Sequence, residues 1–409
     1  MTRTYTTAER AVKIYDLVVS VFDYNCTSDI ITPLELVESQ VDRVISKNPD
    51  DTYLVPGAGI GTYVSVLISK GVNPSNIYAI EIDPAYHELG DGIFRRFGVN
   101  YTHTDFITWR PNMLFNVIIG NPPYQDSSTQ SHDKKLWTQF VNRSLELTVD
   151  GGTVSFVTPS SLVGRTRLPA QMRKLLSTVY SLDWIDHTAK SYFPSVGVDI
   201  CSWSITKRPY TGETLVTDSE GSRVVDIREE LPIPSSNKFK DDLAEKIRSG
   251  ISDTGVPELT RESNDVDQVP DDNGEFLNYH AGKNKFFRTN SICKNTGRLK
   301  VVFSFSATYK QWFITEANVS GTNVYSYVDS VEQGLEIGNT LMHPIMAFYI
   351  DTWRRTAGFC PAIKNNGALP DIRGLDDDQI IKKFNLTDQE VEYIMSNHKS
   401  YKSVDRVFL

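Results

Sequence analysis

Cysteine is scarce in this chain of 409 residues, and its four copies lie far apart in the sequence. They stand at Cys26, Cys201, Cys293 and Cys360, and no two of them form a C-x-x-C pair. This spacing predicts neither a disulfide framework nor a cysteine-based metal site. We therefore expect reduced thiols in a cytoplasmic protein that binds no metal.

Long apolar runs are also missing. No stretch approaches the roughly 18 consecutive apolar residues of a membrane-spanning helix. Residues 1–10 are polar and lack the apolar centre of a signal peptide. We expect no membrane partner.

An overall basic charge is absent as well, since the formal net charge is −9. Phosphate contacts favour basic faces, so this sum argues mildly against a nucleic-acid partner. The distribution argues otherwise: residues 211–280 are acidic and rich in turns, whereas residues 281–315 carry seven basic residues and no acid. Aromatic residues alternate with these bases, and such pairs can contact phosphates and stack on bases. The same stretch is compatible with a β-rich domain that has a solvated lysine face and an aromatic core.

The length exceeds that of one ordinary core, so two domains are expected. Composition changes after Lys207-Arg208-Pro209, which predicts domains at 1–210 and 211–409. In the first, strand-like stretches alternate with helical ones, which predicts an α/β fold with a mostly parallel seven-stranded sheet. The expected strands are 52–56, 77–83, 99–103, 115–120, 153–159, 182–186 and 200–206.

The sequence Asn121-Pro122-Pro123-Tyr124 follows the strand predicted at 115–120. Two prolines fix φ and lack N–H donors, so this backbone cannot continue a sheet and forms a stiff ledge at the strand's end. An amide oxygen, a carbonyl and an aromatic ring on such a ledge can grip a planar amino group. A strand-terminating turn with a buried tyrosine is the simpler interpretation.

A glycine-rich turn, Pro56 to Gly61, joins the first of these strands to a predicted helix at 63–70. Glycines at such a turn let a ligand approach the backbone and the free N–H groups of the helix. Glu81 ends the next strand about twenty residues later, where an acid can hold both hydroxyls of a ribose. Asp105-Phe106 follows the third strand and can meet an adenine, or can be a solvated loop acid and its neighbour. Thr32 is predicted to cap a helix whose first position is Pro33.

In this order, the motifs resemble those of the gamma-class DNA adenine-N6 methyltransferases, the restriction-modification type with an Asn-Pro-Pro-Tyr motif. The resemblance covers roughly residues 25–210 and includes a later phenylalanine loop at Phe193-Pro194. It implies a Rossmann-like methyltransferase domain followed by a mixed α+β target-recognition domain. It also implies S-adenosylmethionine as the cofactor, double-stranded DNA as the partner and a cognate restriction endonuclease as a further partner.

Site residues follow from the same resemblance. The catalytic set is Asn121, Pro122, Pro123 and Tyr124. Cofactor binding is expected from Thr32, Pro33, Pro56, Gly57, Ala58, Gly59, Gly61, Glu81, Ile82, Asp105 and Phe106. Contact with the extruded target adenine or the DNA is expected from Tyr124, Phe193, Lys310, Trp312, Arg354 and Arg355.

One position departs from the family pattern: many members carry an acid two residues before the first loop glycine, where this chain has Val55. Three alternatives remain compatible with the sequence. An RNA adenine suits the same ledge. A protein-glutamine methyltransferase would carry its extra mass before the glycine turn rather than after it. A catalytically silent subunit that binds the cofactor or nucleic acid is the third.

Overall fold

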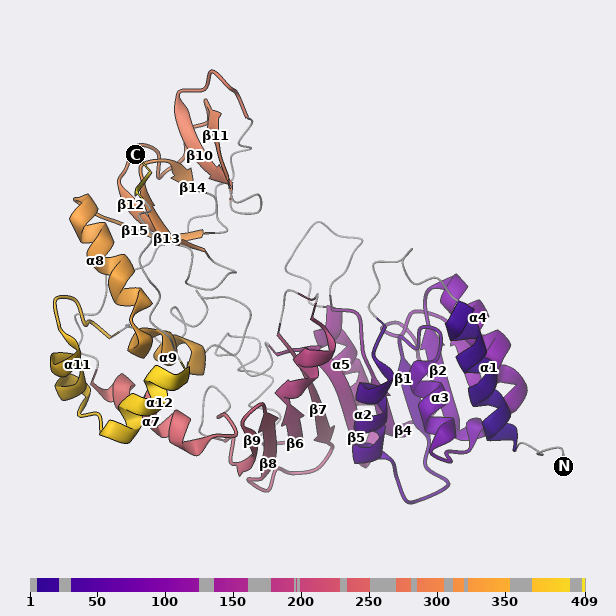
Figure 1. The fold of residues 1–409 in the computed structure, drawn as a ribbon. Helices are drawn as coiled ribbons and strands as arrows, with labels where there is room; N and C mark the ends of the chain where they lie inside the picture. Colours follow the sequence, from indigo (N-terminus) through magenta and orange to yellow (C-terminus); the bar gives the residue numbers. More distant parts are fainter. Residues whose placement is uncertain are drawn as a thin grey trace. The chain divides into compact units, whose positions relative to one another are not determined.

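The computed structural model describes thirteen parts of the chain, and they form two compact units, Met1–Ser236 and Asn237–Leu409 (Figure 1). The described residues are 6–21, 31–124, 136–160, 178–194, 196, 199–228, 234–250, 270–280, 285–304, 312–319, 323–353, 370–397 and 407–408.

The first unit is built on one nine-stranded sheet with the order β3-β2-β1-β4-β5-β7-β6-β8-β9. Neighbouring strands from β3 to β5 are parallel, and β7 runs antiparallel between β5 and β6. This is the Rossmann-like methyltransferase order, so the predicted fold class is confirmed. The strands are β1 (Tyr53–Pro56), β2 (Ile77–Glu81), β3 (Asn100–His103), β4 (Phe115–Gly120), β5 (Thr148–Pro159), β6 (Ser181–Asp186), β7 (Ile200–Thr206), β8 (Thr214–Asp218) and β9 (Gly221–Val225).

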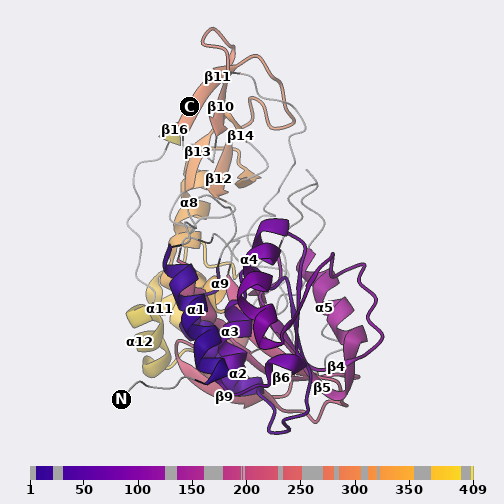
Figure 2. The same ribbon diagram turned by 90° about the vertical axis from the view of Figure 1, so that its right-hand side faces the viewer.

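Helices cover both faces of this sheet. One face carries α1 (Thr7–Val21), α2 (Leu34–Val44), α3 (Thr62–Ser69) and α4 (Pro84–Phe94), and α5 (Leu136–Leu147) lies on the other (Figures 1 and 2). Alternation within the strands explains the two cores. Val55 of β1 packs against α1–α4, whereas its neighbour Leu54 packs with α5.

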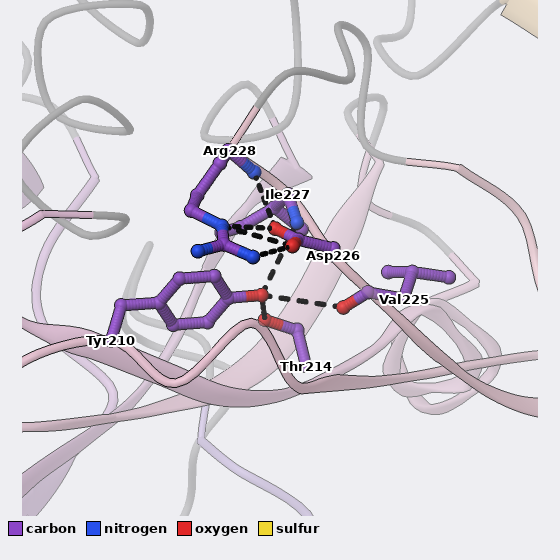
Figure 3. A network of polar contacts seen from close by, with 6 residues as sticks. All are labelled: Tyr210, Thr214, Val225, Asp226, Ile227 and Arg228. Atoms are coloured by element: carbon purple, nitrogen blue, oxygen red, sulfur yellow. Dashed lines mark hydrogen bonds and ion pairs between the residues drawn. The ribbon is translucent and has the colours of Figure 1, made fainter.

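The strands β8 and β9 extend the sheet beyond the seven that we predicted. β8 pairs in parallel with β6 and antiparallel with β9, and the phenol of Tyr210 connects β8 to the end of β9 (Figure 3). That hydroxyl lies 2.9 Å from Thr214 Oγ1 and accepts from the Ile227 N–H at 3.2 Å. Residues 211–228 therefore belong to the first unit, and the division falls after Ser236 rather than at the predicted 210. Turn-rich composition concealed two short strands.

The second unit is mixed α+β. Its two sheets have the orders β11-β10-β14 and β15-β12-β13-β16. Its strands are β10 (Phe276–His280), β11 (Lys285–Thr289), β12 (Lys300–Ser304), β13 (Trp312–Thr315), β14 (Asn318–Val319), β15 (Asn323–Tyr327) and β16 (Val407–Phe408). Its helices are α7 (Lys238–Ser249), α8 (Val331–Met342), α9 (Pro344–Trp353), α11 (Asp377–Phe384) and α12 (Asp388–Asn397).

Two apolar clusters sandwich the strands β12 and β13. Val301 and Ile314 pack against the five helices, while Val302 and Phe313 pack with Tyr279 of β10. Successive residues of one strand thus enter opposite cores.

Across the described ranges, no helix is both long and apolar enough to cross a membrane. Those same ranges contain no group of three or more His, Cys, Asp or Glu side chains arranged to hold a metal ion.

Candidate active site

The ends of β1 and β4 bring the glycine turn and the Asn-Pro-Pro-Tyr sequence together. The two strands are parallel neighbours, so both loops leave the same edge of the sheet. A Cβ added to Gly57 would lie 3.7 Å from Pro123 Cδ, and one added to Gly120 would lie 3.3 Å from the Pro56 carbonyl oxygen. Two motifs separated by some sixty residues thus form one surface.

Three glycines give the turn its shape, because all of them have left-handed backbone angles. The φ values are 65° at Gly57, 55° at Gly59 and 96° at Gly61, which is the N-cap of α3. A Cβ on Gly61 would clash with the ring of Phe94, whereas one on Gly59 would meet nothing within 4 Å. At Gly61 the turn is therefore packed against the Phe94 ring, and at Gly59 it has open space beside it.

Side chains from β2 and β3 hold the open glycine at both its donor and its acceptor. The Gly59 N–H donates to Glu81 Oε2 at 2.7 Å, and the Tyr101 hydroxyl donates to the Gly59 carbonyl at 2.9 Å. Sequence analysis did not select Tyr101. The available signal was its position in the strand predicted at 99–103, which is close enough to the glycine turn for a long side chain to reach it.

Glu81 is 6% exposed and accepts three backbone hydrogen bonds. Oε1 accepts from the N–H groups of Ile82 and Asp83, each at 2.8 Å, and Oε2 accepts from Gly59. Burial raises the pKa of this carboxyl, and the three N–H donors oppose that rise. Since Oε2 accepts only one of these hydrogen bonds, it retains acceptor capacity toward the open side of Gly59.

The residues predicted to surround an adenine separate into exposed and buried ones. Ile82 is 63% exposed, and Asp105 is half-buried with Oδ1 accepting from the Ile107 N–H at 2.9 Å. Phe106 is only 2% exposed, and its ring centroid lies 5.0 Å from that of Phe140 on α5. Ile82 and Asp105 can thus face a ligand directly, while Phe106 belongs to the core beneath them.

Asn121 stands half-buried at the end of β4, between the buried end of the strand and the exposed Pro123. Its Nδ2 donates to Thr32 Oγ1 at 2.9 Å. Its Oδ1 is buried and has no hydrogen-bond partner in the part of the chain that the structure describes. A buried carbonyl oxygen without a partner is costly, so this atom marks a place for an external donor.

The predicted helix cap at Thr32 is wrong. Pro33 occupies the N-cap of α2, without a side-chain capping bond, and Thr32 Oγ1 instead accepts a hydrogen bond from Asn121 Nδ2. The sequence Thr32-Pro33 thus positions the start of α2 against the ledge. The threonine hydrogen-bonds to the side-chain amide of Asn121 and not to the backbone of the adjacent helix.

Tyr124 and Phe193 come together on one small apolar cluster. Both pack with Leu36, Val157 and Ile200. Phe193 is 3% exposed and Tyr124 is half-buried, with its hydroxyl lacking a partner among the described residues. Burial raises the pKa of the Tyr124 phenol, so it stays neutral and presents an uncharged ring.

The remaining predicted contacts fall elsewhere. Lys310, Arg354 and Arg355 lie outside the described residues. Trp312 is 3% exposed in the helix-covered core of the second unit, where a Cβ added to Gly338 of α8 would clash with its ring. This burial gives Trp312 a packing role, so a contact with DNA is not supported for it.

Val55, at the position where the family pattern places an acid, is fully buried in the core that it shares with α1–α4. The side chain at this position therefore faces the core. A carboxylate here would be desolvated among apolar side chains, which this packing does not accommodate.

Sequence comparison finds one family match. Residues 91–193 match the family described as Eco57I restriction-modification methylase. A curated relative, Type II methyltransferase M.CvrRI from Paramecium bursaria Chlorella virus XZ-6E, is 32% identical over 120 residues. The aligned region covers 27% of this chain and 30% of that protein, less than a third of the relative's length.

Solved structures with similar folds include the type IIG restriction endonuclease BpuSI, with a TM-score of 0.43 and 12% identity over 95% of this chain and 63% of that one. The type I restriction-modification methyltransferase subunit from Streptococcus thermophilus has a TM-score of 0.41 and 14% identity over 53% and 55% of the two chains. The fold itself is assigned from this chain's own strand order. The matched segment, residues 91–193, carries Asp105 and the Asn-Pro-Pro-Tyr sequence and is similar to the Eco57I restriction-modification methylase family.

Proposed function

We propose that this chain is a DNA methyltransferase that transfers a methyl group from S-adenosylmethionine to the N6 amino group of an adenine extruded from double-stranded DNA. The observation that carries the proposal is Asn121 Oδ1, a buried acceptor without a partner among the described residues. It stands beside the glycine turn and next to a half-buried tyrosine.

Residues that follow or end β2 and β3 fit the cofactor's nucleoside, and the glycine turn fits its methionine part. Glu81 has the acceptor capacity to take the ribose hydroxyls, and Asp105 has a carboxylate for the adenine amino group. Ile82 supplies an exposed apolar surface for one face of the ring. The turn from Pro56 to Gly61 would hold the methionine part, with Gly59 open toward it. When bound, the cofactor supplies a methyl group activated by its positive sulfur.

At the ledge, this chain's residues would orient the amino group of the target base. Asn121 Oδ1 and the Pro122 carbonyl accept its two hydrogens, which draws the nitrogen lone pair out of conjugation with the ring. The same two oxygens disperse the positive charge that builds on nitrogen during transfer. Tyr124, which is half-buried, would hold the ring by stacking, and Phe193, which is 3% exposed, would support Tyr124 from within the same apolar cluster. No general base is required, because the alkylated amine loses its proton readily to water.

Double-stranded DNA is the proposed substrate, and a cognate restriction endonuclease is the proposed partner. Extruding one adenine costs a few kcal/mol of stacking and pairing. The second unit would offset this cost through contacts between DNA phosphates and exposed basic side chains such as Arg288 and Lys294. Support comes from the family match at residues 91–193 and from the curated relative's description as a Type II methyltransferase.

The test uses the full chain with methyl-labelled S-adenosylmethionine, and it compares duplex DNA, RNA of matched sequence and a glutamine-containing peptide. We expect label in the DNA, recovered as N6-methyladenine after digestion to nucleosides. Asn121→Ala should abolish transfer while leaving cofactor binding within about threefold, because the amide acts on the amino group rather than on the cofactor.

Each other outcome identifies an alternative. Label in RNA alone, or in the peptide alone, would replace the proposed substrate by that one. Cofactor binding without transfer to any of the three would indicate a catalytically silent subunit. Full turnover by Asn121→Ala would remove the ledge from the mechanism.

A further inference from the structure

Lys190, which is not among the predicted site residues, is hydrogen-bonded to the turn that carries Phe193. We propose that Lys190 is a positioning residue: its ammonium ties the two ends of this turn together and so fixes the apolar surface on which Tyr124 rests. The inference rests on the proposed function, in which Tyr124 stacks on the target adenine and Phe193 supports it.

Two backbone carbonyls accept hydrogen bonds from the Lys190 ammonium. Nζ lies 2.9 Å from the Phe193 carbonyl oxygen and also donates to the Val196 carbonyl oxygen. The backbone closes the same turn: the Phe193 N–H donates to the Lys190 carbonyl at 3.0 Å, and the Val196 N–H donates to the Phe193 carbonyl at 3.2 Å. Lys190 thus bonds to both ends of the turn that runs from Phe193 to Val196.

Both ends of this turn also enter one apolar cluster. Phe193 is 3% exposed and Val196 is partly buried, and both pack with Leu36 and Ile200. The half-buried ring of Tyr124 packs against the same cluster. Because tightly packed side chains transmit displacements to their neighbours, a turn that shifts would also move the surface that supports the Tyr124 ring.

The start of the same segment has an anchor of its own. The 3₁₀ helix η5 (His187–Tyr192) follows β6, and Asp186 is its N-cap. Asp186 Oδ1 accepts from the Thr188 N–H at 2.9 Å, and Oδ2 accepts from the Arg43 guanidinium of α2 at 2.9 Å. Lys190 lies in the last turn of this helix, so it fixes the end of a segment whose beginning is already held.

A lysine suits this role because its ammonium carries three hydrogens on one atom and can therefore donate to more than one carbonyl. Hydrogen bonds from a charged donor are stronger than those between neutral groups, so two of them hold the turn firmly. Methionine has a side chain of similar length without these donors. Lys190→Met therefore removes both hydrogen bonds to the turn while it retains the apolar part of the side chain.

The first experiment reads the position of Phe193 in the free protein. The chain is labelled with 4-fluorophenylalanine, and the ¹⁹F signal of Phe193 is assigned by its loss in Phe193→Leu. In Lys190→Met we expect this signal to move toward its position in the unfolded chain, because the ends of the turn are no longer held. A signal that stays at its wild-type position would overturn the positioning role.

The matched control is Lys207→Met. Lys207 Nζ also donates to a backbone carbonyl, that of Thr148 at 2.9 Å. Lys207 follows the carboxyl end of β7, whereas Ile200, which packs with Phe193, begins that strand. This control should leave the Phe193 signal in place and kcat for DNA methylation unchanged. A shift of equal size in the control would mean that the effect is not specific to Lys190, and would overturn the proposal.

Activity tests the same role under the proposed function. Lys190→Met should lower kcat for DNA methylation about tenfold, with the KM for the cofactor unchanged within about twofold, since the glycine turn and Glu81 are untouched. Because Lys190 acts through the turn, the double variant Lys190→Met/Phe193→Leu should lose less than about twofold in kcat beyond Phe193→Leu alone. Losses that multiply would mean that Lys190 acts by a separate route, and would overturn the proposal.

A direct contact with a DNA phosphate is the alternative role for this lysine. Loss of such a contact in Lys190→Met would lower the slope of log Kd against log salt concentration by about one, because one counterion fewer is released. We expect an unchanged slope, and a lowered one would overturn the positioning role. The free protein separates this inference from the proposed function: a Phe193 signal that moves as expected, in a chain that methylates no adenine, would retain the positioning of the turn and reject the proposed function.

Discussion

The edge of the first sheet and the basic stretch of the second unit began as similar signals, in which polar and aromatic residues alternate in one short region. At the sheet edge, Glu81 ends β2 and Asn121 follows β4, the two strands on either side of β1, and both lie close to the glycine turn. In the basic stretch, the aromatics Phe303, Trp312 and Phe313 are buried in the cores on the two faces of one sheet.

The difference lies in what constrains each backbone. Left-handed glycines and paired prolines prevent a regular strand from continuing, so a side chain beside them must stand at a strand's end. A regular strand instead alternates its side chains between two faces, and a basic-aromatic alternation is then what a half-buried strand produces. Chain-breaking residues are therefore the more specific signal for a site.

The largest expected effect tests the core assignment of the aromatics. Trp312→Ala should lower the free energy of unfolding of the second unit by about 3–5 kcal/mol, because it empties a packed site against α8. Denaturant unfolding of the full chain, followed by probes in that unit, measures it. Lys294→Glu, at an exposed position, is the control and should change stability by less than about 0.5 kcal/mol. Unchanged stability combined with weakened DNA binding in Trp312→Ala would return this residue to the recognition surface.

Two glycines of the turn give a matched comparison within the first unit. Gly61→Ala should cost about 2–4 kcal/mol, since a left-handed φ is added to a clash with the Phe94 ring. Gly59→Ala adds only the φ strain, about 1–2 kcal/mol, but places a methyl group on the open side of the turn. We expect unfolding measurements to rank Gly61→Ala as the less stable, and calorimetry to show the greater loss of cofactor affinity in Gly59→Ala. Equal losses of stability would mean that the turn relaxes around Gly61.

Sequence reasoning located the turn, the acid and the ledge because glycine, proline and the ends of strands are local features. It missed β8 and β9, since two short strands with exposed residues leave little apolar pattern among turn residues. It also misassigned Thr32, whose partner Asn121 is 89 residues away. The buried hydrogen bond that Gln40 Nε2 donates to Ser155 Oγ likewise joins residues 115 positions apart. Such long-range hydrogen bonds depend on how helices and strands pack against one another. The residue pattern within a single helix or strand does not contain that information.

Buried charge distinguishes the two units as well. Lys300 on β12 is 0% exposed, and burial lowers its pKa to about 8 from the usual 10.5. Between those values the unfolded chain binds more protons than the folded one, so stability of the second unit rises with pH through that window and is reduced below it. Lys300→Met should therefore raise the free energy of unfolding at pH 7 by about 1–3 kcal/mol and flatten its pH dependence. Lys294→Met, at an exposed lysine, should do neither. A wild-type unit whose stability is flat between pH 8 and 10 would contradict the buried charge.

Glu81 is the corresponding buried charge of the first unit. Its carboxylate accepts three backbone N–H hydrogen bonds, whereas the Lys300 ammonium donates to the backbone carbonyl of Arg298. Burial still raises the pKa of Glu81 above the usual carboxyl value. In the proposed function the ribose hydroxyls of the cofactor donate to the ionised carboxylate, so affinity should be full above the raised pKa and should fall as pH drops through it. Each pH unit below that pKa should weaken binding up to about tenfold. The loss thus begins at a higher pH than an ordinary glutamate would produce.

Titration calorimetry across pH 4–8 measures this dependence, with Glu81→Gln as the matched variant. We expect Glu81→Gln to bind the cofactor more weakly at neutral pH and to show no such slope, because an amide does not titrate in this range. A wild-type slope that persists in Glu81→Gln would assign the titration to another group. A flat wild-type profile would mean that Glu81 holds only the glycine turn through the Gly59 N–H, and that the ribose lies against other acceptors.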